Sequence, residues 1–111
     1  MAAKRHPRVR PVDAAIARLM ALVAKGVPPH RIAREVEMVV AEWLGGPDAD
    51  PADAKTWLDE LREQIVVGVA DAEEQVSYVD AGEAAAVRQA GLTLAALRAS
   101  RDAVERASAS L

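Results

Sequence analysis

Hydrophobic residues recur every three or four positions along most of the chain, the spacing of one apolar face of an α-helix. In the N-terminal part this spacing predicts a helix at about 14–25 that Asp13 caps, and a second helix at about 29–44. Gly26 and the two prolines that follow separate them. Their apolar stripes are Ile16, Leu19, Met20 and Val23, then Ile32, Val36, Val39, Val40 and Trp43.

Two longer helices follow a stop at Gly45-Gly46-Pro47-Asp48. Asp50 and Pro51 are typical of a helix start, and the apolar spacing continues to about residue 77. The β-branched run at 65–69 is also compatible with a strand. However, no second strand of comparable strength exists to pair with it. Asp80 to Glu83 has the spacing of a capping box, which predicts a fourth helix at 81–107.

The fold class that these helices predict is all-α. We expect 51–77 and 81–107 to form a long antiparallel helical hairpin, with the two shorter N-terminal helices packed on it. A turn near residues 79–80 places facing residues so that Gly68 meets Gly91, and two facing glycines would let the helices cross closely. A short loop joins the helices that hold Trp43 and Trp57, so we expect both rings to pack at that corner.

Helix length adds a prediction about shape. At 1.5 Å per residue each long helix runs to about 40 Å, whereas a compact chain of this size is about 34 Å across. The hairpin should therefore extend beyond the shorter helices. The last helix also has a second stripe of small residues, which contains Ala96, Ala99 and Ala103. We expect either an N-terminal helix or another chain to cover this stripe.

Charge is distributed unevenly along this single domain of 111 residues with a formal net charge of −3. The first ten residues carry four basic side chains and no acid: Lys4, Arg5, Arg8 and Arg10. Residues 48–83 hold eleven acids against two basic side chains. We therefore divide the chain into a basic N-terminal arm at 1–12 and a helical domain at 13–111. The arm suggests an electrostatic partner, and the alternative is a solvated, disordered tail.

The sequence offers little for catalysis. The chain has no cysteine and only His6 and His30, which excludes thiolate chemistry and disfavours a zinc site. No phosphate-binding loop and no carboxylate–histidine pair for a di-iron centre occurs. We expect no enzyme activity, cofactor, metal or small-molecule substrate. No apolar run approaches the length of a membrane span, and no signal segment follows the basic start, so we expect a cytoplasmic protein.

One segment suggests a nucleic-acid alternative. Residues 16–36, with Ile32-Ala33-Arg34-Glu35 after a glycine turn, resemble the first two helices of resolvase-like helix-turn-helix domains. In that family a short turn and a groove-reading helix follow at once. Here residues 37–44 prolong the second helix and the next helix is acidic. The alternative function is therefore a small nucleic-acid-binding regulator that uses the basic arm and a truncated helix-turn-helix-like segment at 13–36.

The favoured interpretation is a non-enzymatic helical protein–protein interaction or assembly protein, with copies of itself or a larger protein as partner. In its specific form the basic arm of one copy contacts Asp59, Glu60 and Glu63 of the next, a head-to-tail contact that builds rings or filaments. A structural, adaptor or inhibitor component of a phage or mobile element is the class of protein we expect, in the host cytoplasm or the virion.

Overall fold

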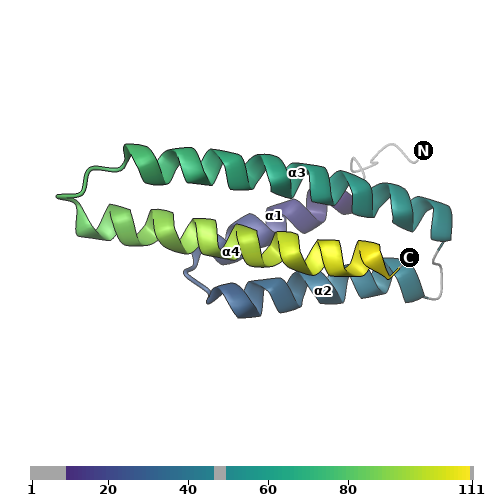
Figure 1. Cartoon of the computed structure of the whole chain (residues 1–111). Coiled ribbons are helices and arrows are strands. Elements are labelled where there is room, and N and C mark those ends of the chain that lie inside the picture. The colour runs from purple at the N-terminus through teal and green to yellow at the C-terminus, as the bar shows by residue number, and fades with distance from the viewer. Residues whose placement is uncertain (1–9, 47–49, 111) are drawn as a thin grey trace, which may run out of the picture.

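The computed structural model describes residues 10–46 and 50–110. These residues form four α-helices, α1 (Pro11–Ala24), α2 (Pro29–Gly45), α3 (Pro51–Tyr78) and α4 (Ala84–Ala109), and contain no strand. The predicted all-α fold is confirmed: α3 and α4 are the long antiparallel hairpin, and two shorter helices precede it (Figure 1).

Proline starts each of the first three helices. Pro11, Pro29 and Pro51 occupy the first turn, where no intrahelical donor is needed and the fixed φ suits the helix. The predicted start of α1 at about residue 14 is too late, because the helix begins at Pro11. Val12 is fully buried as a result. Asp13 lies inside the first turn rather than at the N-cap.

The β-branched run at 65–69 is helical, as the flanking periodicity predicts. Asp50 caps α3: its Oδ1 accepts hydrogen bonds from Ala52 N at 2.9 Å and Asp53 N at 3.4 Å, the pattern of a favourable N-cap. One stripe of α3 faces the core, with Leu58 and Ile65 each 1% exposed. The whole buried stripe is Ala54, Leu58, Leu61, Ile65, Val69 and Ala72.

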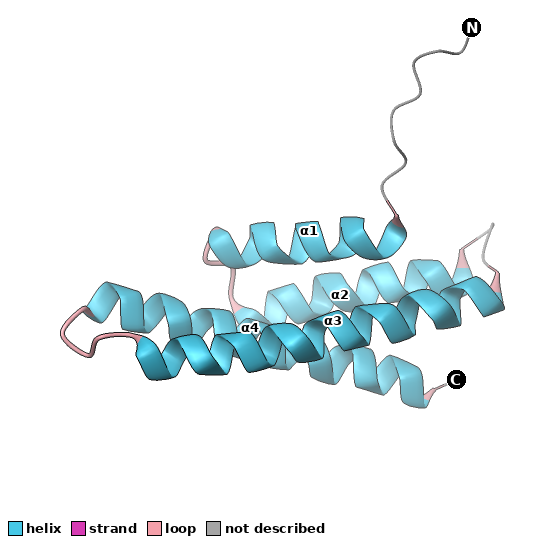
Figure 2. Cartoon of the chain, turned by 90° about the horizontal axis from the view of Figure 1, so that it is seen from above, coloured by secondary structure: helices cyan, strands magenta, loops and turns pink. Residues whose placement is uncertain are grey.

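The four helices enclose one hydrophobic core. Helix α4 packs along both α3 and α2, while α1 lies on the opposite side and contacts α2 and α3 (Figures 1 and 2). At one end, where α2 leads into α3, the rings of Trp43 and Trp57 meet edge to face with centroids 5.8 Å apart. This is a preferred geometry for two aromatic rings. The predicted tryptophan corner is confirmed.

The hairpin register differs from the prediction. Asp80 does not cap α4; its Oδ1 accepts a hydrogen bond from Gly82 N at 2.9 Å, as aspartate often does in turns. Residues 79–83 form a connector, and α4 begins only at Ala84. A Cβ added to Gly68 would lie 3.6 Å from Leu97 Cδ1, and one added to Gly91 would meet nothing within 4 Å. The predicted Gly68–Gly91 contact is therefore wrong.

The molecule is elongated, with principal extents of 54 × 40 × 20 Å. In both views the hairpin of α3 and α4 extends well past the turn that joins α1 to α2 (Figures 1 and 2). This confirms the prediction from helix length that the shorter helices cover only part of the hairpin.

Candidate interaction surface

The free end of the hairpin is a continuous unburied segment, which we call the overhang and define as residues 73–95. Ala72 on α3 and Ala96 on α4 are the last buried residues on either side of it. No residue between them is buried. The overhang thus comprises the last turns of α3, the connector and the first turns of α4.

Large apolar side chains are concentrated on the overhang. Of the eight exposed large hydrophobic residues in the described chain, four lie within it. Val76 is 41% exposed, Tyr78 75%, Val87 44% and Leu92 39%. Exposed apolar side chains of this size on a small domain are candidate contact points for a partner.

A groove of about 350 Å³ lies on the overhang between α3 and α4. Ala72, which belongs to the buried stripe, is at its inner end, so the groove continues the line of the core beyond the point where α1 and α2 end. Its lining is mostly small and apolar, with two glutamines and a threonine: Ala72, Gln75, Val79, Ala86, Gln89, Ala90 and Thr93.

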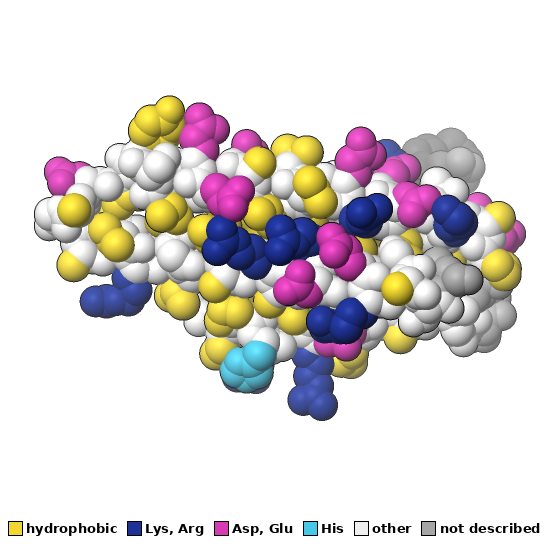
Figure 3. All heavy atoms as spheres, viewed as in Figure 1, with side chains coloured by type: hydrophobic (Ala, Val, Ile, Leu, Met, Phe, Trp, Pro, Cys, Tyr) yellow, Lys and Arg dark blue, Asp and Glu magenta, His cyan; other side chains and the backbone are white. Residues whose placement is uncertain are grey.

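The overhang is acidic. It carries four carboxylates, Glu73, Glu74, Asp80 and Glu83, and one basic residue, Arg88. The carboxylate of Glu73 pairs with Arg98 of α4 at 2.8 Å. Over the middle of the face in Figure 3, basic and acidic side chains alternate along the junction of α3 and α4. Glu74, Asp80 and Glu83 form no ion pair with another described residue.

A basic segment lies at the base of the overhang. Residues 21–34, which we call the basic turn, run from the end of α1 into α2 and contain Lys25, His30, Arg31 and Arg34 but no acid. Arg31 and Arg34 line one surface hollow of about 310 Å³ together with Glu35 and Met38. The molecule therefore presents opposite charges on two neighbouring surfaces.

Of the charged residues predicted to contact a partner, Arg10 and Glu60 meet within one chain. Arg10 forms an ion pair and hydrogen bond with Glu60 of the same molecule, and Lys55 Nζ lies 3.1 Å from Asp59 Oδ2. Glu63 is exposed and pairs with no described residue. Lys4, Arg5 and Arg8 lie outside the described residues. Within one chain Arg10 thus pairs with Glu60, and the predicted contact between the arm and a second copy stays a prediction.

The alanine stripe of α4 is covered by the chain itself. Ala96 and Ala103 are buried and Ala99 is half-buried, and α2 packs along this helix. The first alternative, an N-terminal helix as cover, is confirmed. Ala96 and Ala103 are therefore core residues, and the prediction that they contact a partner is wrong for the folded chain.

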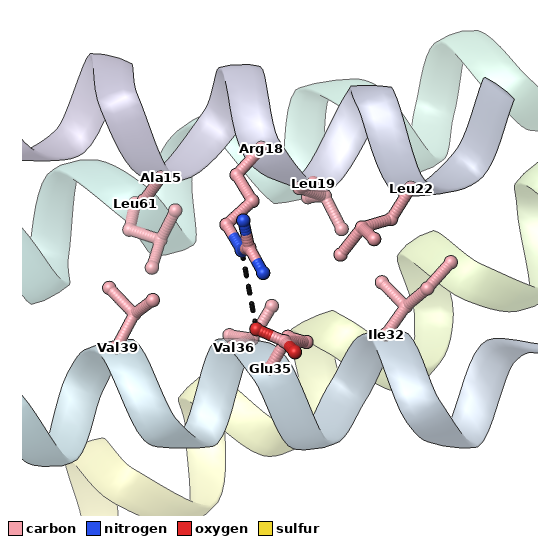
Figure 4. Close-up of a pocket in the computed structure, with 9 residues that line it drawn as sticks. All are labelled: Ala15, Arg18, Leu19, Leu22, Ile32, Glu35, Val36, Val39 and Leu61. Atoms are coloured by element: carbon pink, nitrogen blue, oxygen red, sulfur yellow. Dashed lines mark hydrogen bonds and ion pairs between the residues drawn. The ribbon is translucent and has the colours of Figure 1, made fainter. Parts of the chain in front are cut away.

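The small cavity between α1 and α2 is a gap between packed side chains. Its volume of about 10 Å³ corresponds to a single water molecule at most. Apolar side chains from both helices surround it, and Arg18 bridges to Glu35 at 3.2 Å across it (Figure 4). A space so small cannot hold a substrate.

The rest of the described chain offers no metal site and no membrane span. Among residues 10–46 and 50–110, no group of three or more His, Asp or Glu side chains could hold a metal ion. No helix in that part of the chain is long and apolar enough to cross a bilayer. Comparison with protein-family models, curated proteins and solved structures finds no match to this chain.

Sequence reasoning missed the groove residues and the exposed Val76, Tyr78 and Val87 as a binding surface. The signal was present in the helix lengths: 14 and 17 residues for α1 and α2, against 28 and 26 for α3 and α4. Where α3 and α4 extend beyond α1 and α2, their apolar stripes have no helix of the same chain to pack against. Because the predicted hairpin is longer than the two N-terminal helices, the apolar residues near its free end could have been predicted to lack cover.

Proposed function

We propose that the protein is a non-enzymatic interaction or assembly protein that binds a protein partner through the overhang. One observation carries the proposal: no residue of the segment 73–95 is fully buried within the chain and most are exposed, yet the segment bears large exposed apolar side chains and a groove. Covering such side chains stabilises a complex by about 25 cal/mol per Å² of apolar surface.

The chemistry of the overhang defines what fits it. The groove needs an apolar ridge, which a helix with one hydrophobic face provides. Glu74, Asp80 and Glu83, which pair with no other described residue, favour a partner with basic side chains around that ridge. For so small a chain we propose a structural, adaptor or inhibitor role in a phage or mobile element, in the host cytoplasm or the virion.

Site-specific photocrosslinking tests the proposal. A photoreactive amino acid replaces Val87, which is 44% exposed on the overhang, or Met20, which is 45% exposed on α1 and serves as the matched control. We expect a protein adduct of defined mass from position 87 in cells that express the chain, and none from position 20. Equal adduct yields at both positions, or no adduct at either, would reject the overhang as the binding surface.

The nucleic-acid alternative is supported by the shared hollow of Arg31 and Arg34. However, Arg10 lies at the opposite end of α1 from these residues, so it is not part of the same basic surface. Titration with duplex DNA at low and high salt separates the two functions. Binding that falls steeply with salt and is lost in R31E/R34E would favour the alternative.

A further inference from the structure

We propose that the occupant of the overhang is the overhang of a second copy of this chain, laid antiparallel across a two-fold axis. The inference rests on the proposed function and names its partner. In this dimer the hairpin end of each copy packs its helices against the groove of the other, and the two hairpin ends form a four-helix bundle between the two cores.

The geometry favours a hairpin as occupant. Along the core, α3 and α4 are covered by two further helices, α1 and α2, and both stop at the base of the overhang (Figures 1 and 2). Two helices are therefore needed to continue the bundle, and a second overhang supplies two. Ala86 and Ala90 line the groove with small side chains, which permits short distances between packed helices.

Charge selects the antiparallel orientation. In a parallel pair the acidic ends, with Glu74, Asp80 and Glu83, would lie together and repel. In the antiparallel pair each acidic end lies instead against the partner's basic turn, which is the segment 21–34 of the second copy. Like charges are separated and opposite charges meet, which stabilises this register.

The same symmetry closes the assembly. Each copy has one overhang and one basic turn. Under two-fold symmetry the overhang of each copy contacts the basic turn of the other, so two equivalent contacts form. Within residues 10–46 and 50–110, the overhang and the basic turn are then both covered in each copy. The arrangement thus predicts a discrete dimer with twice the chain mass of 11.8 kDa.

The test is the solution mass of the full chain, measured by light scattering and sedimentation, with charge-reversed variants. R31E/R34E makes the basic turn acidic while the overhang stays acidic, and E74K/E83K makes the overhang basic while the basic turn stays basic. We expect each variant alone to dissociate about tenfold or more readily than the wild type. An equimolar mixture should restore the dimer, because both contacts are then between opposite charges.

Two controls isolate the surface. E42K/E63K reverses two exposed acids away from the overhang and should dimerise like the wild type. Replacing Lys4, Arg5 and Arg8 by Gln should also leave the dimer intact, since the arm takes no part. Circular dichroism and thermal melting confirm that each variant is folded.

The outcomes separate the inference from the proposed function. A wild-type monomer at the highest soluble concentration would overturn the second copy as occupant, while a foreign adduct at position 87 would still support the proposed function. A dimer that survives both charge reversals unchanged, or that is lost with the arm substitutions, would overturn this arrangement. Larger oligomers would contradict the two-fold closure.

Discussion

The two halves of the hairpin have the same apolar periodicity but different surroundings. In the half covered by α1 and α2, Leu58, Leu61 and Ile65 are each 1% exposed. In the overhang the same stripe of α3 continues to Val76, which is 41% exposed. An apolar stripe therefore shows that a helix face will be covered, but not by which chain. One half stabilises the monomer, and we propose that the other half binds a partner.

The largest effect is expected in the covered half. Replacing Leu58 by Ala removes a side chain from the centre of the core and leaves a cavity, which costs about 2–5 kcal/mol of unfolding free energy. Urea denaturation followed by circular dichroism measures the loss. A change below about 1 kcal/mol would show that the core collapses around the site or is not closely packed there.

A matched pair of substitutions compares the two halves directly. Val69 is 5% exposed and Val76 is 41% exposed, and both lie on one face of α3, two turns apart. V69A should cost about 1.5–2 kcal/mol of unfolding free energy, because two buried methyl groups are lost. V76A should be neutral or stabilising in the monomer by about 0.5 kcal/mol, because alanine has the higher helix propensity.

The proposed dimer, by contrast, should lose affinity in V76A, because Val76 would be covered at its interface. Urea denaturation at low protein concentration gives the monomer values for both variants, and light scattering gives the association. Equal destabilisation by V69A and V76A at low concentration would contradict the division into a covered half and a free half.

Helix capping gives a smaller contrast. Asp50 accepts two backbone hydrogen bonds at the start of α3 in the covered half, whereas Glu83 at the start of α4 makes no side-chain cap. D50A should reduce the unfolding free energy by about 1 kcal/mol, and E83A by no more than about 0.3 kcal/mol. Thermal melting of the two variants under identical conditions checks the difference, and a larger loss in E83A would contradict it.

The smallest effect is expected at the Arg10–Glu60 ion pair. Their side chains are 58% and 35% exposed, and solvent screens a pair of this kind. A double-mutant cycle with R10A and E60A should give a coupling free energy of about 0.5 kcal/mol that falls with added salt. A larger coupling would mean that the N-terminal end of α1 is held to α3 mainly by charge.

Local sequence signals specify the helices well. Gly26, with φ of 75°, ends α1 in the left-handed conformation that glycine adopts most easily. Asp50-Pro51 begins α3 as predicted, and periodicity identifies the β-branched run at 65–69 as helix. These signals act within one or two turns of chain, so a single sequence contains them.

The register of the hairpin depends on longer-range geometry. Asp80 has two local options, to cap a helix or to form a turn with Gly82, and the turn delays the start of α4 to Ala84. That shift sets Gly68 against Leu97 in place of Gly91. The overhang likewise depends on where α1 and α2 end in space, which no local pattern within residues 73–95 records.

Concentration-dependent hydrogen exchange tests the central claim most directly, namely that the overhang is uncovered in the monomer and covered in the dimer. At low protein concentration we expect backbone amides of 73–78 and 84–95 to exchange much faster than those of 54–72 and 96–104. At high concentration the overhang amides should gain protection while the core amides stay unchanged. Overhang amides as protected as the core at low concentration, or indifferent to concentration, would contradict this division of the hairpin.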